Sequence, residues 1–256
     1  TPKPLTEREI EDIIERFGNA ASISKEAGFT GVQIHAAHGY LISQFLSPLS
    51  NLREDKWGGS LENRARFLLA IYKNMRAKVG DKFPIGVKLN SADFQKGGIT
   101  EEESMQVIDM LSAIGIDLIE VSGGTYERPK MMGSKIKDST KKREAYFIDF
   151  IRKVRKQTNV PLMLTGGVRN VDFMEECLAT NQLDFIGIAR PFALLPNLVQ
   201  KIFNRELKSL KHLESKFSGT LDLIVHEKYL KDIGAGKNPK VLEGLSAKIF
   251  FIKNFF

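Results

Sequence analysis

An amphipathic helical pattern followed by a short apolar segment recurs five times along the chain, and this alternation constrains the fold more than any other feature. Short apolar segments of this kind suit strands that are buried on both faces. Strands that alternate with amphipathic helices are typical of a parallel sheet covered by helices. The expected strands are 32–35, 85–89, 118–122, 161–165 and 184–188.

Capping signals indicate where the expected helices begin and end. Thr6 and Thr100 each precede a glutamate by three positions, which is the capping-box pattern. Ser60 stands before a further helical pattern as an N-cap, and Gly80 stands where that helix should end. The segment between the first expected strand and Ser60, about 39–59, is predicted to be a long loop.

The order of these elements favours one of two architectures. A (β/α) barrel places its functional residues directly after strand ends, and several expected strands here are followed by polar or glycine residues. A doubly wound sheet would instead need a glycine-rich fingerprint after its first strand, and residues 36–40 do not supply one. We therefore expect an α/β fold of the TIM (β/α)8-barrel type.

Composition excludes several classes of protein and site. The single cysteine, Cys177, excludes a disulfide framework within the chain and a multi-cysteine metal or iron–sulfur site. No segment approaches the ~18 consecutive apolar residues of a membrane helix. Residues 201–256 hold 11 Lys or Arg against 6 Asp or Glu, but apolar residues are interspersed among them. We expect a cytoplasmic protein that binds no metal, nucleic acid or membrane.

The first expected strand ends in three side chains that can hydrogen-bond or transfer protons, His35, His38 and Tyr40. Residues three apart on a regular strand point to opposite faces, so the two imidazoles converge only if the chain bends between them. The carboxyl end of a strand is where α/β folds place chemistry. These three residues are the candidate catalytic site, and a pair of structural histidines is the alternative.

Two glycine-containing turns follow the last two expected strands. Gly166 and Gly167 end one strand, and Ala189 and Arg190 follow the other. Backbone N–H groups in such turns can cradle a phosphate, because glycine lets the ligand come close to the backbone. Arg190 would add a charge-assisted contact. These four residues are the candidate phosphate site.

Lys88 lies inside an otherwise apolar strand, where a charge needs a partner or an anionic ligand. Two interpretations stay open. In one, Lys88 pairs with a neighbouring acid such as Glu120. In the other, its ammonium contacts a ligand.

Taken together, these segments resemble the Old Yellow Enzyme family of FMN-dependent NADH:flavin oxidoreductases, from about Leu5 to about Pro239. The most specific match is the run 35–48, His-Ala-Ala-His-Gly-Tyr-Leu-Ile-Ser-Gln-Phe-Leu-Ser-Pro. It continues through Asn51, Arg53, Asp55 and the run 57–64, Trp-Gly-Gly-Ser-Leu-Glu-Asn-Arg.

The resemblance implies a role for each candidate residue. His35 and His38 would bind the carbonyl oxygen of an α,β-unsaturated substrate, and Tyr40 would give a proton to its α-carbon. Lys88 would lie beside the flavin ring, where many relatives carry arginine. Gly166 and Gly167 with Arg190 would hold the FMN phosphate, although Ala189 stands where glycine is usual.

The implied reaction has two halves, in which NADH or NADPH reduces FMN and the flavin then passes hydride to the β-carbon of a small enone-type substrate. The chain begins at the helix before the family's fourth strand. The resemblance thus implies about the last five βα units of the barrel, over residues 1–240, and a tail over 241–256.

Five strands cannot close an eight-stranded barrel. We therefore expect an N-terminal segment, or another copy in a homo-oligomer, to complete it. A truncated, non-catalytic fragment that acts as an assembly or interaction module is the alternative function. A phosphate-binding barrel enzyme without flavin is a third interpretation.

Overall fold

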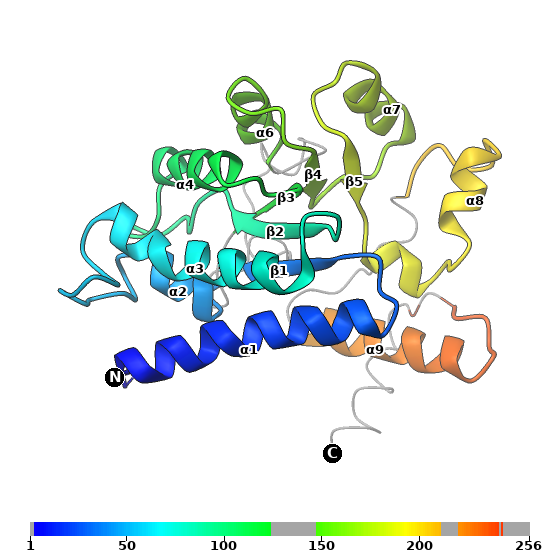
Figure 1. Cartoon of the computed structure of the whole chain (residues 1–256). Helices are drawn as coiled ribbons and strands as arrows, with labels where there is room; N and C mark the ends of the chain where they lie inside the picture. Colours follow the sequence, from blue (N-terminus) through cyan, green and yellow to red (C-terminus); the bar gives the residue numbers. More distant parts are fainter. Residues whose placement is uncertain (1–2, 124–146, 211–219, 241, 243–256) are drawn as a thin grey trace. The chain divides into compact units, whose positions relative to one another are not determined.

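The computed structural model describes residues 3–123, 147–210, 220–240 and 242 (Figure 1). These residues form two compact units. The first is built from the described residues up to 123 together with 147–164 and 183–185. The second is built from 165–182 and from the described residues after 185.

One sheet contains all five expected strands, and its strands follow one another in chain order. The first four pair in parallel, as predicted, and each strand end differs from the expected one by at most one residue. The strands are β1 (Val32–Ala36), β2 (Ile85–Asn90), β3 (Leu118–Ser122), β4 (Leu162–Thr165) and β5 (Phe185–Gly187).

Three helices of the first unit begin at the predicted caps. Thr6 and Thr100 both form complete capping boxes, and the Ser60 hydroxyl accepts the backbone N–H of Asn63. Each such cap satisfies N–H groups that the helix leaves without an internal partner. The helices are α1 (Glu7–Glu26), α2 (Leu41–Leu46), α3 (Leu61–Val79), α4 (Glu101–Ala113) and α6 (Ile148–Arg155).

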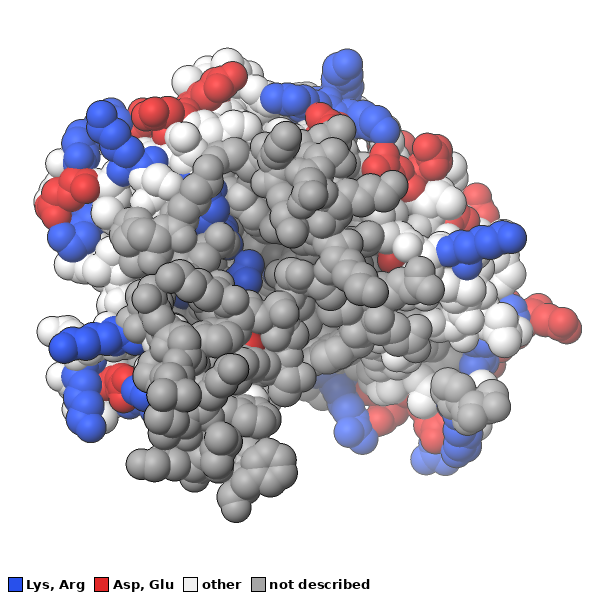
Figure 2. All heavy atoms as spheres, turned by 180° about the vertical axis from the view of Figure 1, so that it is seen from behind, with Lys and Arg blue, Asp and Glu red and all other residues white. Residues whose placement is uncertain are grey.

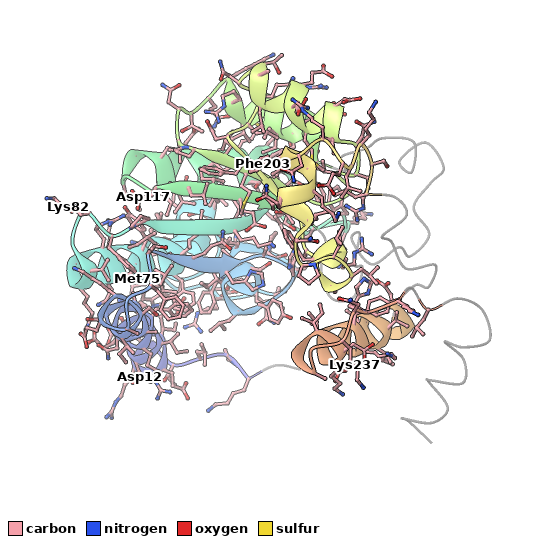
Figure 3. All side chains as sticks on the ribbon, turned by 90° about the vertical axis from the view of Figure 1, so that its right-hand side faces the viewer. Asp12, Met75, Lys82, Asp117, Phe203 and Lys237 are labelled. Carbon is pink, nitrogen blue, oxygen red and sulfur yellow. The ribbon has the colours of Figure 1, made fainter. Side chains whose placement is uncertain are left out.

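Helix α1 packs along α3, as Figure 3 shows with Asp12 marking α1 and Met75 marking α3. The apolar faces of these helices and the strands form the core of the first unit. Removing such side chains from water supplies most of the driving force for folding. Fully buried members include Ile10, Ile34, Phe67, Leu68, Ile71, Ile85, Leu89 and Ile108.

The second unit contains four described helical segments. They are α7 (Val171–Ala179), the 3-10 helix η2 (Arg190–Ala193), α8 (Leu198–Phe203) and α9 (Thr220–Gly234). Helix α9 packs against η2, so a C-terminal element contacts the turn that carries Arg190. Tyr229 of α9 is completely buried, and its hydroxyl accepts the backbone N–H of Leu242.

The predicted loop at 39–59 was wrong in part, because it contains helix α2. No side chain caps this helix, and four of its six residues are buried. Tertiary packing therefore forms it without a local start signal. The lysine-rich stretch 128–143 and the tail 241–256 lie, apart from residue 242, outside the described residues.

Acidic and basic side chains stand close together on the face shown in Figure 2. Ion pairs among the described residues include that of Lys153 with Glu101, at 2.7 Å. None of the helices in the described ranges combines the length and the hydropathy that a membrane crossing requires. The same residues contain no group of three or more His, Cys, Asp or Glu side chains placed to hold a metal ion.

Candidate active site

The chain bends after β1 as the sequence requires for its two imidazoles to converge. Strand β1 ends at Ala36, and His38 adopts a left-handed backbone conformation with φ 63°. The rings of His35 and His38 lie edge to face with their centroids 5.2 Å apart. The Tyr40 ring lies 4.9 Å from the His35 ring. The structure thus brings the three candidate catalytic side chains together, and we call them the histidine site.

The histidine site is accessible to a ligand. Tyr40 is 42% exposed, and His35 is exposed while His38 is partly buried. A left-handed conformation is uncommon outside glycine, but histidine is among the residues that adopt it more often. The following residue, Gly39, also has a positive φ of 79°. The tight turn therefore directs three side chains to one side of the strand end.

Lys88 and Glu120 lie directly beside the histidine site. They are register partners on β2 and β3, and the Lys88 Nζ lies 2.8 Å from the Glu120 Oε1. His35 is in turn the register partner of Lys88 on β1. The predicted ion pair is therefore present. An ammonium has three N–H donors, so pairing with one carboxylate leaves capacity for a ligand as well.

The electrostatic surroundings keep both histidines neutral. Burial lowers the pKa of His38 to about 4, the Lys88 ammonium and the His35 ring add to this, and Glu120 opposes it. Burial, followed by the charge of Lys88, likewise lowers the pKa of His35, again against Glu120. A neutral imidazole carries one N–H donor and one acceptor nitrogen. Each ring can therefore donate one hydrogen bond to an oxygen at neutral pH.

Two polar residues hold His38 in place, and sequence reasoning assigned neither of them this role. The backbone N–H of His38 donates to Asn90 Oδ1 at 3.1 Å. Its ring Nε2 lies 2.7 Å from the hydroxyl of Ser122, which is completely buried. Asn90 and Ser122 are register partners at the ends of β2 and β3. The signal that could have found Ser122 is its position two residues after Glu120, on the same face of the strand.

The candidate phosphate residues lie in the second unit. Gly166 and Gly167 have φ values of 127° and 77°, which glycine adopts without steric cost. A Cβ at Gly187 would lie only 1.7 Å from Thr165 Oγ1, so the two turns approach closely. The Thr165 Oγ1 is buried and has no hydrogen-bond partner within the described part of the chain. An orphaned hydroxyl beside two glycines in this conformation fits a phosphate site.

Arg190 pairs with an acidic residue of helix α9. Its Nη1 lies 3.3 Å from Asp222 Oδ2 on α9, and the Arg190 side chain keeps 34% of its surface exposed. The imidazole of His226 donates from Nδ1 to the Asp222 carbonyl oxygen at 2.7 Å. Burial lowers the pKa of His226, but hydrogen bonds to Asp222 outweigh it, and the pKa is raised. Nothing in the sequence links α9 to this turn, so Asp222 and His226 were not predicted.

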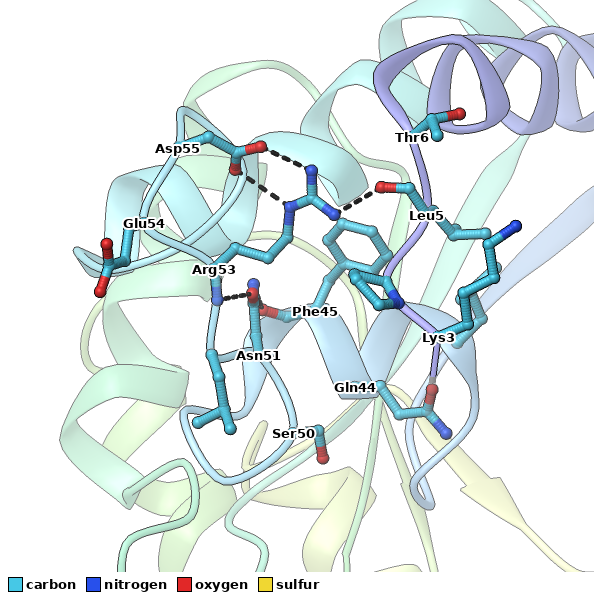
Figure 4. Close-up of a pocket in the computed structure, with 13 residues that line it drawn as sticks. Lys3, Leu5, Thr6, Gln44, Phe45, Ser50, Asn51, Arg53, Glu54 and Asp55 are labelled. Carbon is cyan, nitrogen blue, oxygen red and sulfur yellow. Dashed lines mark hydrogen bonds and ion pairs between the residues drawn. The ribbon is translucent and has the colours of Figure 1, made fainter. Parts of the chain in front are cut away.

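A separate cavity of about 650 Å³ lies in the first unit, between the N-terminal segment and the loop after α2 (Figure 4). Arg53 spans its rim, with its guanidinium donating to Asp55 and to the Leu5 carbonyl oxygen. Phe45 contributes apolar surface to its wall. None of the candidate catalytic or phosphate residues lines this cavity.

The chain is similar to known proteins over about four fifths of its length. The NADH:flavin oxidoreductase / NADH oxidase family model matches residues 1–208. The chain is 41% identical over 213 residues to the NADH-dependent flavin oxidoreductase iliE of Hypocrea jecorina, covering 81% of this chain and 53% of that protein. It is 36% identical over 201 residues to the NADH oxidase of Thermoanaerobacter brockii, covering 78% and 30%.

Solved structures agree with the fold. Morphinone reductase superimposes with a TM-score of 0.66 at 27% identity, covering 82% of this chain and 53% of that one. The old yellow enzyme homologue from Zymomonas mobilis gives a TM-score of 0.64 at 26% identity, covering 80% and 55%. A complex of 2-naphthoyl-CoA reductase gives 0.73 at 35% identity, covering 79% and 30%. The expected α/β fold of TIM-barrel type is confirmed.

The chain spans about half the length, or less, of these relatives. The expected cofactors, FMN with NADH or NADPH, are supported by the family and by relatives named for NADH and NADPH. The family match does not favour the alternative of a non-catalytic assembly module. From the family match over four fifths of its length, the chain belongs to the NADH:flavin oxidoreductase / NADH oxidase family.

Proposed function

We propose that this chain carries the substrate-activating site of an FMN-dependent ene-reductase, which reduces an alkene conjugated to a carbonyl group. The observation that supports this proposal most is the convergence of His35, His38 and Tyr40 at the end of β1. Two neutral N–H donors and one phenol in a single exposed cluster suit an oxygen that gains negative charge and a carbon that gains a proton.

His35 and His38 act as hydrogen-bond donors to the carbonyl oxygen of the substrate. Charge builds on that oxygen as the alkene accepts hydride, and preorganised donors stabilise it most strongly in the transition state. Because the pKa of both imidazoles is lowered, they donate hydrogen bonds as neutral rings and do not protonate the oxygen. The developing enolate then keeps its nucleophilic α-carbon.

Tyr40 supplies the proton to that α-carbon. A phenol has an ordinary pKa of ~10, so it stays protonated at neutral pH until a strong base such as an enolate forms. Its ring lies 4.9 Å from that of His35, so one substrate can contact both. Tyr40 is 42% exposed and can be reprotonated from water.

When bound, FMN would supply the redox chemistry, taking hydride from NADH or NADPH and giving it to the substrate β-carbon. Lys88 would contact its ring through N–H groups not used by Glu120. The orphaned hydroxyl of Thr165, the turn at Gly166 and Gly167, and the exposed part of Arg190 would hold its phosphate. Ala189 has a negative φ of −124° and needs no glycine-specific conformation.

The five strands correspond, in this proposal, to the last five of an eight-stranded barrel. The remaining strands would come from an N-terminal segment or from another copy of the chain. Supporting this, the match to full-length relatives covers only about half of each. Size measurements with and without FMN would distinguish a second copy from an additional segment.

The proposal is tested by incubating the 256-residue chain with FMN, desalting it and recording the absorption spectrum from ~300 to 600 nm. Retained flavin that NADH reduces, and that an enone such as cyclohexenone reoxidises, is the expected result. Retained flavin that only oxygen reoxidises would contradict the alkene substrate. A colourless protein would contradict flavin binding by this chain alone.

A further inference from the structure

His38 is fixed at two points by the ends of β2 and β3. Its backbone N–H binds Asn90 Oδ1 at 3.1 Å, and its ring Nε2 lies 2.7 Å from Ser122 Oγ. The Asn90 side chain is itself oriented, because its Nδ2 donates to Asp93 Oδ1 at 3.2 Å. An amide with its nitrogen on a carboxylate must present its oxygen to the N–H of His38. Asn90 therefore fixes the backbone of His38, and rotation of the ring would break its contact with Ser122.

The Nε2 atom of the His38 ring lies against the hydroxyl of a buried residue, Ser122. Ser122 is completely buried, whereas His38 itself is only partly buried. Among the described residues, no hydrogen bond is formed by the His38 Nδ1. The ring nitrogen available to a ligand is thus Nδ1, and its chemistry depends on whether it carries the proton.

A neutral imidazole has a single N–H, and its position is set by the hydrogen bond at the other nitrogen. If Nε2 kept the proton and donated to Ser122, Nδ1 would present a lone pair to the ligand and repel an oxygen. If the Ser122 hydroxyl donates to Nε2, the proton is held on Nδ1. Only the second arrangement makes His38 a donor toward a carbonyl oxygen.

We propose that Ser122 is a positioning residue that donates its hydroxyl hydrogen to His38 Nε2 and thereby holds His38 in the Nδ1–H tautomer. The role of this tautomer in binding a carbonyl oxygen rests on the proposed function. The contact between Ser122 and His38 does not rest on it. A serine hydroxyl can donate or accept, so the direction of the hydrogen bond in this contact is what the measurement of the tautomer reads. The two parts are therefore tested separately.

The tautomer is read directly from the ¹⁵N shifts of the imidazoles in long-range ¹H–¹⁵N spectra of the histidine-labelled chain, at pH 7 and without flavin. The chain has four histidines, and the His38 signals are assigned by their loss in His38→Asn. The expected result is a protonated Nδ1 and an unprotonated Nε2. A protonated Nε2 in the unsubstituted chain would overturn the proposal.

Variants at Ser122 separate tautomer control from a merely structural role. Ser122→Ala should move the proton of His38 to Nε2, whereas Ser122→Thr keeps a hydroxyl and should restore Nδ1–H. Ser91→Ala is the matched control, because Ser91 is also a buried serine, at the end of β2, and its Oγ has no hydrogen-bond partner within the described residues. It should leave the tautomer unchanged. An unchanged His38 signal in Ser122→Ala would overturn the proposal.

Ligand binding then tests what the tautomer does. The probe is 4-hydroxybenzaldehyde, whose oxygen imitates an enolate, added to the FMN-loaded chain and followed by its effect on the flavin spectrum. Ser122→Ala should weaken binding about tenfold, the factor that loss of one hydrogen bond of typical strength produces, and Ser122→Thr should recover most of it. Equal affinities in all three proteins would overturn the role in binding. Failure of the unsubstituted chain to bind FMN would contradict flavin binding by this chain alone, while the ¹⁵N shifts would still decide the tautomer.

Discussion

Lys88 and Glu120 face each other across neighbouring parallel strands, and their ion pair places two opposite charges beside two neutral histidines. The pair lies in register with His35, so its charges act on the site at short range. Lys88 lowers the pKa of His35 and of His38, and Glu120 raises both. The pKa of each histidine therefore depends on both charges, and replacing either Lys88 or Glu120 should change it.

We predict opposite shifts from the two neutralising substitutions. Lys88→Met removes a positive charge and should raise the pKa of both histidines, whereas Glu120→Gln removes a negative charge and should lower both. NMR titration of the labelled imidazoles measures each pKa. Lys82→Met, on the loop that leads into β2 (Figure 3), is the control and should shift neither. Shifts of the same sign in Lys88→Met and Glu120→Gln would contradict the electrostatic account.

Acid should destabilise the fold through the histidine site. The folded pKa of His38 is about 4, below its ordinary value of 6.5, so the unfolded chain binds more protons between these values. The stability that neutral His38 contributes is present above pH 6.5 and is lost as the pH falls toward 4. Urea unfolding at pH 7 and pH 4.5 should show that the free energy of unfolding falls less for His38→Asn than for the unsubstituted chain. An identical loss would show that His38 is not buried in its neutral form.

Tyr40→Phe should separate the two halves of the reaction. The phenol hydroxyl donates the proton to the substrate, but it has no role in hydride transfer from nicotinamide to flavin. We expect alkene reduction to fall by about 10²-fold or more, in the range for loss of a general acid, while flavin reduction by NADH is nearly unchanged. Rapid-mixing spectra of each half-reaction measure this. An equal loss in both would rule out Tyr40 as the proton donor.

Gly187 should not accept a side chain. A Cβ there would lie 1.7 Å from Thr165 Oγ1 and 2.8 Å from Thr165 Cβ, so Gly187→Ala forces the neighbouring atoms to move. Overpacking of this kind lowers the free energy of unfolding by about 1–3 kcal/mol. Gly234→Ala is the control, since its Cβ would meet nothing within 4 Å at the end of α9. Urea unfolding midpoints should fall for the first variant and hold or rise for the second. Equal midpoints would mean that the two turns are more loosely packed than described.

Arg64 should matter for stability far more than its neighbour Arg66. The Arg64 side chain is 5% exposed, donates to the carbonyl oxygens of Leu46 and Gly59, and pairs with Glu103. Arg64→Ala leaves these acceptors unpaired and should cost about 3 kcal/mol. Arg66 is exposed, and Arg66→Ala should cost about 0.5 kcal/mol. A free energy of unfolding unchanged in Arg64→Ala would contradict the buried network.

The sequence was sufficient for the strands and caps because each of these depends on a local pattern. The capping boxes at Thr6 and Thr100 need only residues three positions apart, and the strand bounds follow short apolar runs. Helix α2 was missed because its apolar run has no capping residue and is stabilised by burial against the rest of the unit. Local propensity cannot report such packing.

The residues of the candidate site also differ in whether a local pattern could predict them. His35, His38 and Tyr40 were found because they are close in sequence, and their bend follows from strand geometry. The contact between Ser122 and His38 joins residues 84 positions apart, and that between Asp222 and Arg190 joins residues 32 apart. Such pairs depend on strand register and helix packing, which one sequence does not display.

The left-handed backbone of His38 also limits how this position can vary among related sequences or in design. Apart from glycine, the residues that tolerate a φ of 63° are mainly asparagine, aspartate and histidine. Of these, asparagine has a neutral side-chain N–H donor. Unlike histidine, it has no second tautomer in which an acceptor replaces that donor. A sequence with asparagine at position 38 would no longer need a hydroxyl at position 122, so these two positions are expected to change together.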